Sequence, residues 1–489
     1  MDGKVVDANL HIDKIRVTFF EEYTSYILPI ILIFADYIAV LTGEGIAFWL
    51  RSSIIPLFLS NFDVPDIYLY VVIPLIFLFF LHFDRMHIRR MPFWQMTEKL
   101  FKASTYAVLA IIVIMYFAGV TKEISRIFMF LLWFLSFLSL AVIRYSLKKA
   151  LNHLGLLQLP VILIGAGKTA ELLLSSFQQD AGLGYKVVGI IEDNPSVAIR
   201  EKYPIIGTFC NAEDTIRRSG VKNVIIAAPG LGREKLLNLI HRLQPHVRKI
   251  AFVPDLFGVP VSSMELETLV DERVVLLKVR NNLARAYNRN VKYIFDIVVS
   301  MIGLVMILPA FIIICLFIYL DSPGPVIFKH YRVGQSGQRF PCYKFRTMVC
   351  NSSKVLDEYL LQNPEACAEW ERDFKLKNDP RVTKIGNFLR KTSLDELPQL
   401  LNVIKGEMSL VGPRPIVQAE IPRYGEYIND YYQVRPGITG MWQVSGRNDI
   451  DYPERVKMDS WYVRNWSIWL DIVFLMKTIK VVLDKKGAY

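Results

Sequence analysis

A chain of 489 residues is long enough for two or three folded units, and 53% of its residues are hydrophobic. Its formal net charge of +11 suits anionic lipid headgroups or nucleotides. Nucleic acid is disfavoured as a partner because no nucleic-acid-binding motif accompanies the charge. Five cysteines without a CxxC pair argue against a disulfide framework or a zinc site and fit a reducing cytosol.

Four apolar blocks in the first part of the chain predict transmembrane helices. They lie near Tyr26–Phe48, Ile67–Phe83, Thr105–Val120 and Ile127–Ile143, and each approaches the length of about 20 residues that crosses a bilayer. Basic residues follow the second and fourth blocks, whereas the first and third connections carry few. This pattern predicts a four-helix transmembrane domain over residues 1–150, with the N-terminus and everything after Arg144 in the cytoplasm.

Residues 155–275 show the pattern of a Rossmann-like α/β domain, which opens with LPVILIGAGKTAELLLSSF as strand, glycine turn and helix. Three further strands are predicted in YKVVGIIED, VKNVIIAAPG and RKIAFVPD. Gly165, Gly167 and Ala170 match a loose dinucleotide fingerprint, with Glu192 beyond it. A nucleotide-free relative of that fold, in which the glycines only permit a tight turn, is the other reading. It is favoured because the acid follows the last glycine by more than the usual distance of about 20 residues.

A third unit, residues 285–489, opens with the long apolar run Ile294–Leu320. Its length would allow it to cross a membrane, but basic residues crowd both flanks, so it has no preferred crossing direction. Pro309 lies near its middle, where proline removes a backbone donor and breaks a helix. A helix that enters one leaflet, bends at Pro309 and returns satisfies both observations. The sequence therefore predicts a monotopic domain with a re-entrant membrane helix.

The stretch Lys391–Pro415, KTSLDELPQLLNVIKGEMSLVGPRP, sets two adjacent carboxylates beside an arginine held between prolines. Asp395 can attack phosphorus, Glu396 can hold a metal or a proton, and the Arg414 fork can hold a phosphate. A second reading makes Asp395 the N-cap of the helix that follows. Both readings stay open, and they need not conflict, because a helix N-terminus also attracts phosphate.

This stretch, with VRPGITGMWQVSGRN (Val434–Asn448) and DSWYVRNWSIWLDI (Asp459–Ile472), resembles the catalytic domain of the bacterial polyprenyl-phosphate hexose-1-phosphate transferases. Their large, multi-domain galactose members are the most similar. The resemblance implies transfer of hexose-1-phosphate from a UDP-sugar to undecaprenyl phosphate, with release of UMP, at the cytoplasmic side of the bacterial inner membrane. The product would start the assembly of a cell-surface polysaccharide. Family members also carry a re-entrant helix with a proline at the position of Pro309.

The resemblance also assigns roles within the site. Asp395 is the expected nucleophile, which forms a sugar-phosphoryl-aspartate intermediate. Glu396, together with Asp395, is the expected ligand of Mg²⁺, which needs few protein carboxylates because it bridges phosphate oxygens. The remaining expected residues bind phosphate or position the groups that do: Lys344, Arg346, Arg390, Arg414, Arg435, Arg447 and Asp459.

The tryptophans of this unit are interpreted as anchors at the membrane interface, with a platform for the sugar as the alternative: Trp442, Trp461, Trp466 and Trp469. Expected partners are a UDP-sugar, undecaprenyl phosphate and the bilayer, then a homodimer partner and downstream glycosyltransferases. Three alternative functions stay open. The first is the same reaction with glucose, and the second is a catalytically inactive scaffold or regulator of glycan assembly. The third is a membrane oxidoreductase, which would need a nicotinamide in the Rossmann-like domain.

Overall fold

The computed structural model describes residues 19–54, 64–119, 125–254, 264–269, 274–279, 282–373, 376, 379–445 and 450–484. The chain forms two compact units, Met1–Asp255 and Leu256–Tyr489. Each unit has its own hydrophobic cores.

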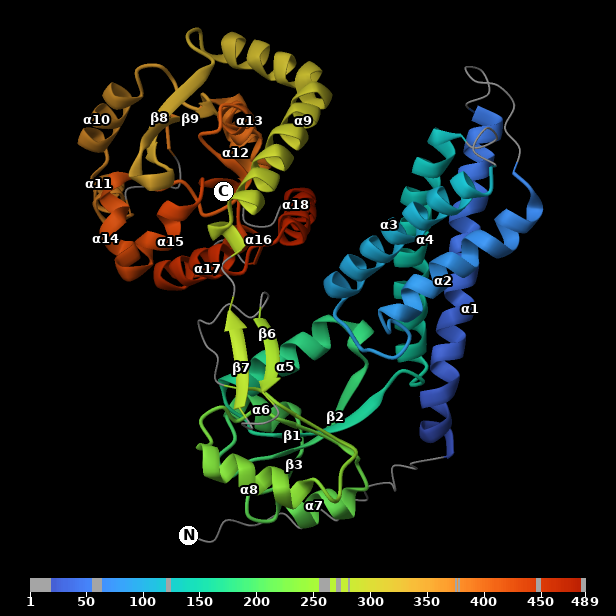
Figure 1. Ribbon diagram of the computed structural model, residues 1–489. Helices are drawn as coiled ribbons and strands as arrows, with labels where there is room; N and C mark the ends of the chain where they lie inside the picture. The colour runs from blue at the N-terminus through green and yellow to red at the C-terminus, as the bar shows by residue number, and fades with distance from the viewer. Residues whose placement is uncertain are drawn as a thin grey trace, which may run out of the picture. The chain divides into compact units, whose positions relative to one another are not determined.

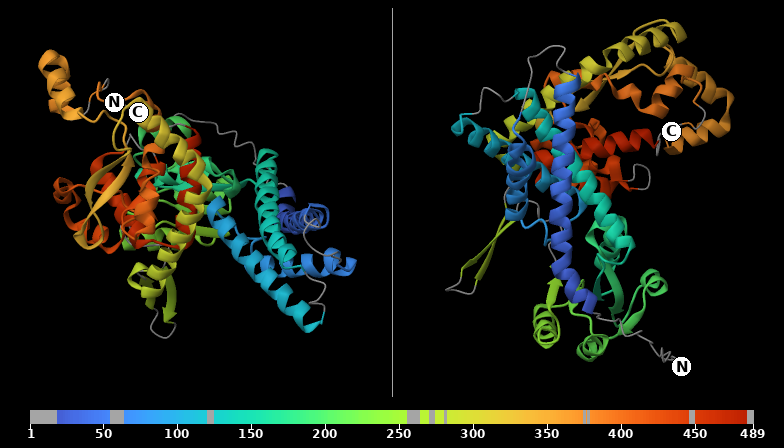
Figure 2. Two further views of the ribbon diagram at one scale, coloured as in Figure 1. Left: turned by 90° about the horizontal axis from the view of Figure 1, so that it is seen from above. Right: turned by 90° about the vertical axis from the view of Figure 1, so that its right-hand side faces the viewer.

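The first unit begins with a bundle of apolar helices: α1 (Phe19–Trp49), α2 (Ile73–Phe83), α3 (Phe93–Phe117) and α4 (Arg126–His153). Figures 1 and 2 show α1 and α4 side by side. Gly43 permits this close approach, because a Cβ there would lie 2.6 Å from the Cα of Ser136. Buried side chains from all four helices form one apolar core, while many other apolar side chains face outward.

Within the described residues, all four predicted apolar blocks form helices, which differ in length. The segments Ile27–Ser53, Phe93–Phe117 and Arg126–His153 are long and apolar enough to cross a membrane. The second block forms the shorter apolar helix Tyr68–Phe83, which starts with a π-helical turn, η2 (Tyr68–Val72). The fourth described helix of membrane-crossing length is α9 (Ala286–Asp321), in the second unit.

The rest of the first unit is a parallel five-stranded sheet with helices packed on it, in the strand order β3-β2-β1-β4-β5. The strands are β1 (Leu159–Ile164), β2 (Tyr185–Ile191), β3 (Ile205–Gly207), β4 (Asn223–Ile226) and β5 (Lys249–Phe252). The helices are α5 (Lys168–Gln179), α6 (Val197–Lys202), α7 (Ala212–Ser219) and α8 (Arg233–Leu243). The sequence reading missed β3, because a three-residue strand is too short to show an apolar pattern.

The glycine turn after β1 is shaped by packing, and an internal carboxylate binds its amide. Gly165 has a φ of 107°, and a Cβ there would lie 2.6 Å from the carbonyl oxygen of Ala227. The amide of Ala166 donates to Glu192 Oε2 at 2.9 Å. A carboxylate therefore lies where a bound phosphate would meet the turn, which favours the nucleotide-free reading of the fingerprint.

The second unit contains a hairpin, the long helix α9 and a helical domain with two small sheets (Figure 1). Its strands are β6 (Met264–Leu269), β7 (Val274–Val279), β8 (Ile327–Val333), β9 (Arg339–Phe345), β10 (Ser409–Val411) and β11 (Gly437–Thr439). Its further helices are α10 (Ser352–Gln362), α11 (Pro364–Asp373), α12 (Lys384–Thr392), α13 (Gln399–Ile404), α14 (Ile421–Tyr424), α15 (Ile428–Gln433), α16 (Met441–Ser445), α17 (Tyr452–Arg464) and α18 (Ile468–Leu483). Strand pairs β6–β7 and β8–β9 are antiparallel, whereas β10–β11 is parallel.

Helix α9 carries the predicted membrane run with Pro309 inside it, and Figure 1 shows the helix changing direction partway along. A straight helix of its 36 residues would be about 54 Å long. Both ends nevertheless pack on the same fold. Asp296 is buried near the N-terminal end, and the Phe311 ring lies 4.8 Å from that of Phe345 beyond the proline. Between these contacts apolar side chains are exposed, Val305 by 72%.

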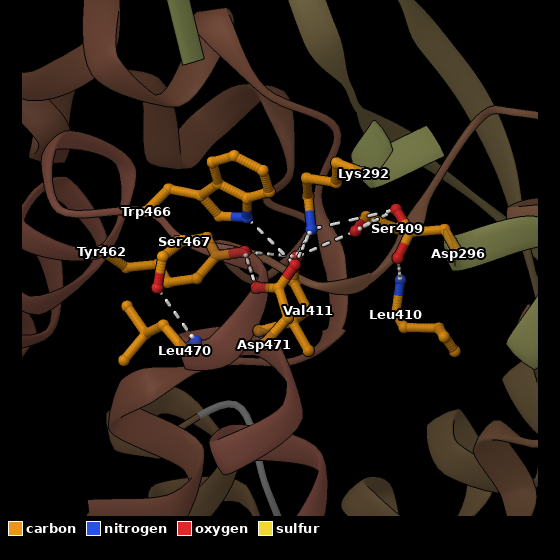
Figure 3. A network of polar contacts seen from close by, with 10 residues as sticks. All are labelled: Lys292, Asp296, Ser409, Leu410, Val411, Tyr462, Trp466, Ser467, Leu470 and Asp471. Carbon is orange, nitrogen blue, oxygen red and sulfur yellow. Dashed lines mark hydrogen bonds and ion pairs between the residues drawn. The ribbon is translucent and has the colours of Figure 1, made fainter. Parts of the chain in front are cut away.

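A buried ion pair fixes the N-terminal arm of α9, residues 286–308, to the domain core (Figure 3). Lys292 Nζ donates to Asp471 Oδ2 at 2.8 Å and to the carbonyl of Val411 at 3.0 Å. Asp471 also accepts hydrogen bonds from the Tyr462 hydroxyl at 2.6 Å and from Trp466 Nε1 at 3.0 Å. These contacts join α9 to α17, α18 and β10.

The second carboxylate of this network holds β10 directly. Asp296 accepts from Ser409 Oγ at 2.7 Å and from the amide of Leu410 at 3.2 Å (Figure 3). Because Arg414 follows β10 by three residues, α9 also sets the position of the arginine turn.

Lys292→Met is expected to lower the free energy of unfolding of the second unit by about 3–5 kcal/mol, because it leaves Asp471 and Asp296 buried without a cation. Adding Asp471→Asn removes one of these charges and keeps an oxygen acceptor for its other donors, so part of the stability should return. Thermal unfolding in detergent measures both effects. The matched control is Lys480→Met at an exposed position of α18. Equal stability of the Lys292 and Lys480 variants would contradict a stabilising role for the network.

Candidate active site

The acidic pair lies in a 3₁₀ turn, η6 (Leu394–Glu396), between α12 and α13. Ser393 precedes it with a φ of 56°, a left-handed conformation that non-glycine residues rarely adopt, and this ends α12. The N-cap of α13 is Pro398, and no side chain caps it. The reading of Asp395 as the cap of that helix is therefore wrong. Its carboxylate pairs with Lys344 instead.

The C-terminal end of α9 positions α12 and, through it, the acidic pair. Asp321 Oδ2 accepts from the amide of Ile385 in the first turn of α12 at 3.1 Å. Gly386 packs so closely there that a Cβ would lie 2.0 Å from the carbonyl oxygen of Thr347. At the other end of α12, Arg390 Nε donates to Thr347 Oγ1 at 3.0 Å. Direct contacts thus lead from α9 to the turn that carries the carboxylates.

Lys344 on β9 bridges the two carboxylates. Its Nζ lies 2.7 Å from Glu396 Oε1 and 3.5 Å from Asp395 Oδ2. Burial raises the pKa of Asp395 above its usual value and Glu396 adds to this shift, whereas Lys344 and Arg390 oppose it. Burial alone would lower the pKa of Lys344, but the two carboxylates raise it above its usual value. The lysine therefore stays charged and favours the ionised form of the pair.

The GPRP turn meets the RPGITG motif through glycines. A Cβ on Gly437 would lie 2.1 Å from the amide nitrogen of Gly412, so neither motif tolerates a side chain at this crossing. Arg414 follows Gly412 and is exposed, with its guanidinium carbon 5.7 Å from the ring centroid of Trp442. Its charge acts on Lys344 and lowers the pKa of that lysine, against the effect of the carboxylates. The arginine turn therefore lies within electrostatic range of Lys344, the lysine that bridges the acidic pair.

Two other predicted phosphate ligands, Arg346 and Arg435, contact α9 or the residue directly after it. Arg346 is buried and donates to the carbonyl of Ser322, directly after α9. The Arg435 guanidinium carbon lies 4.2 Å from the ring centroid of Tyr293 on α9. Predicted Arg447 lies outside the described residues.

Asp459 on α17 is buried and accepts from the Tyr424 hydroxyl at 2.9 Å. Burial raises the pKa of Asp459 to about 7, while the charges of Arg455 and Arg414 act to lower it. The sequence reading missed Arg455. The signal that could have found it is the spacing of four residues from Asp459, which puts both on one face of a helix.

The interpretation of the tryptophans as membrane-interface anchors is wrong for two of them. Trp442 and Trp466 are only 4% and 3% exposed, because both pack inside the second unit. Trp442 contacts Arg414, and Trp466 donates to Asp471.

The residues that could hold a divalent cation are Asp395 and Glu396. In the part of the chain that the structure describes, no cluster of three or more His, Cys, Asp or Glu residues has a geometry for binding a metal. Mg²⁺ commonly takes one or two carboxylates and completes its oxygen shell with water and substrate phosphates. Two adjacent, partly exposed carboxylates satisfy that requirement.

An apolar helix of membrane-crossing length, a carboxylate pair bridged by a lysine and an exposed arginine turn fit a membrane-associated enzyme that acts on phosphate compounds. Comparison with known families gives a more specific result. The model of the bacterial sugar transferase family matches residues 287–485, and that of a CoA-binding domain matches residues 86–254.

Individual relatives agree with the first of these matches. The undecaprenyl-phosphate galactose phosphotransferase of Salmonella typhimurium is 42% identical over 82% of this chain and 83% of its own length. The UDP-galactose-lipid carrier transferase of Erwinia amylovora is 41% identical over 82% and 83%, respectively. The UDP-glucose:undecaprenyl-phosphate glucose-1-phosphate transferase of Escherichia coli K12 is 34% identical over 69% and 70%. The chain belongs to the bacterial sugar transferase family, as its motifs predict.

Asp395→Asn is expected to raise the unfolding temperature at pH 8. Because the pKa of Asp395 is raised by folding, the folded protein holds this proton more tightly, and ionisation at high pH costs stability. The amide avoids that cost, and the gain should shrink as the pH falls toward the unfolded pKa of about 3.9. Thermal unfolding at pH 8 and pH 4 tests this, with Asp484→Asn at an exposed site as control. A variant less stable than wild type at pH 8 would refute the prediction.

Proposed function

We propose that this chain transfers galactose-1-phosphate from UDP-galactose to undecaprenyl phosphate and releases UMP, which starts the assembly of a cell-surface glycan. The observation that carries the proposal is the Asp395–Glu396 pair, held against Lys344 within range of Arg414. Relatives with galactose in their names are 42% and 41% identical. A relative named for glucose is 34% identical, so glucose is the second candidate for the sugar.

Asp395 supplies the nucleophile of the first step. Its burial disfavours the charged carboxylate and so makes it more reactive, while Lys344 and Arg390 favour ionisation. A carboxylate oxygen attacks the sugar-bearing phosphorus of the UDP-sugar. The bond from that phosphorus to the bridging oxygen breaks, and UMP leaves with the electron pair. A sugar-phosphoryl-aspartate remains.

The lipid phosphate completes the reaction. One of its oxygens attacks the same phosphorus, the bond from phosphorus to Asp395 breaks, and the carboxylate is regenerated. The product is undecaprenyl-diphosphate-hexose. Lys344, Arg390 and Arg414 bind and neutralise the phosphates, while Arg346, Arg435 and Asp459 position the elements around them.

Glu396, together with Asp395, is the proposed protein ligand of Mg²⁺. When bound, the ion supplies positive charge to phosphate oxygens and so stabilises their charge during transfer. The homodimer and the downstream glycosyltransferases remain predictions of the sequence.

Helix α9 is proposed to be re-entrant in the cytoplasmic leaflet of the bacterial inner membrane. Three observations support this: an internal Pro309, apolar side chains exposed around it, and packing of both arms on one fold. A helix that crossed the bilayer would carry its two ends to opposite sides. The re-entrant arrangement instead places a bilayer-confined acceptor beside α12 and its acidic turn.

The α/β domain is proposed to be Rossmann-like, which its parallel strand order supports, with a role in regulation or assembly. An oxidoreductase function is disfavoured because Glu192 binds the glycine-turn amide itself. An inactive scaffold is disfavoured because the acidic pair, its lysine and the arginine turn are all present.

Purified protein in nanodiscs, given UDP-galactose or UDP-glucose with undecaprenyl phosphate, should release UMP fastest with UDP-galactose, and EDTA should stop the release. Asp395→Asn should reduce turnover at least about 1,000-fold, because an amide cannot attack phosphorus. Asp484→Asn, at an exposed site, should match wild type. Turnover by Asp395→Asn within tenfold of wild type would exclude it as nucleophile, and a glucose lipid as main product would reassign the sugar.

Single cysteines placed at Arg285 and at Gln338 should react with a membrane-impermeant maleimide from the same, cytoplasmic side, because they flank a re-entrant helix. The labels are introduced after the exposed Cys210 and Cys350 and the half-exposed Cys315 and Cys367 are changed to serine, which leaves only the buried Cys342. Inverted and right-side-out vesicles report the two faces. Labelling of the two positions from opposite sides would show that α9 crosses the membrane.

A further inference from the structure

Two arginines from different motifs lie against one buried tryptophan. The Trp442 ring centroid is 3.9 Å from the guanidinium carbon of Arg455 and 5.7 Å from that of Arg414. Arg455 comes from the first turn of α17, and Arg414 from the turn after β10. Tyr452 also contacts Arg455, with its ring centroid 5.5 Å from the guanidinium carbon. Trp442 therefore contacts two like charges, and the charge of Arg414 acts unfavourably on that of Arg455.

Donor atoms of this cluster have no protein partner. Among the described residues, Arg455 Nε and Trp442 Nε1 are buried and lack any hydrogen-bond acceptor. The charge of Asp459 acts on Arg455, but the Asp459 carboxylate accepts its hydrogen bond from Tyr424. Buried donors without acceptors cost free energy, and a native protein that keeps them commonly uses them for a ligand. The missing partner is an acceptor with negative charge.

The cations form an ordered series that starts at the acidic pair. Lys344 contacts both carboxylates, and the charge of Arg414 acts on Lys344. Burial lowers the pKa of Arg455, and the charge of Arg414 lowers it further. Arg414 thus lies within electrostatic range of Lys344 and of Arg455. A nucleoside diphosphate sugar presents a matching series: the sugar-bearing phosphate, the second phosphate, and the nucleoside.

We propose that Arg455 and Arg414, held on Trp442, bind the phosphate of the leaving nucleotide, which is the phosphate of the UDP-sugar that carries the nucleoside. This inference rests on the proposed function and adds a binding residue that the motifs did not single out. Two guanidinium forks match the oxygens of one phosphate, and such a phosphate would give Arg455 Nε its acceptor. Charge developing on the departing UMP would be stabilised at the same place.

The phosphate of undecaprenyl phosphate has similar chemistry, so the test separates the two sources. In full-length protein in nanodiscs, Arg455→Gln should raise the Kd of UMP and the KM of the UDP-sugar about tenfold or more, with the KM of undecaprenyl phosphate unchanged. Competition by uridine, which lacks the phosphate, should not change. Arg455→Lys keeps the positive charge but loses the planar guanidinium that can donate two parallel hydrogen bonds, so it should give an intermediate Kd for UMP.

The matched control is Arg423→Gln, because the guanidinium carbon of Arg423 lies 5.2 Å from the centroid of the same Tyr452 ring, and its side chain is exposed. It should leave all these constants unchanged. The inference is overturned if both Arg455 variants keep the UMP affinity of wild type, or if only the KM of the lipid phosphate rises. In that case turnover by the wild-type protein would still uphold the proposed function. If UMP binding depends on Arg455 but the wild-type protein makes no lipid product, the nucleotide-phosphate site is upheld and the proposed reaction is refuted.

Discussion

The arrangement of the second unit depends on one constraint: both arms of α9 must pack on a single fold while the apolar segment between them stays exposed. The N-terminal arm is held by charge, because Lys292 pairs with Asp471 inside the core. The C-terminal arm is held by apolar contacts such as Phe311 with Phe345, and by the bond from Asp321 to the start of α12. The first arm sets β10 and the arginine turn, and the second sets α12 and the acidic turn. Bending of one helix therefore brings the two halves of the site together.

The charged groups of the site differ in their partners. The acidic pair is partly buried, and burial favours the protonated form of Asp395, while Lys344 and Arg390 offset that tendency. Arg414 acts on Lys344 and contacts the ring of Trp442. Lys344 is therefore placed to set the ionisation of the acidic pair, whereas the exposed guanidinium of Arg414 lies against an aromatic ring and suits the phosphate-binding role proposed for it.

The sequence identified the acidic pair, the arginine turn and four of the five strands of the parallel sheet, because each has a strong local pattern. It missed the three-residue strand Ile205–Gly207, which is too short for a periodic signal. It read Trp442 as a membrane anchor, although that side chain is 4% exposed inside the fold. Neither error could be avoided from local pattern, since burial and strand pairing depend on distant segments.

The sequence by itself determined which blocks are apolar enough for a membrane and where a proline interrupts one of them. It also determined which carboxylates and arginines lie in dense motifs. These properties belong to single residues and to short-range periodicity. Only the tertiary structure decided which charges meet. It pairs Lys344 with both carboxylates, joins Arg346 to the residue directly after α9, and brings Arg455 and Arg414 to the same Trp442 ring. The physical reason is that ion pairing and stacking act over a few ångströms in space, whatever the separation of the partners along the chain.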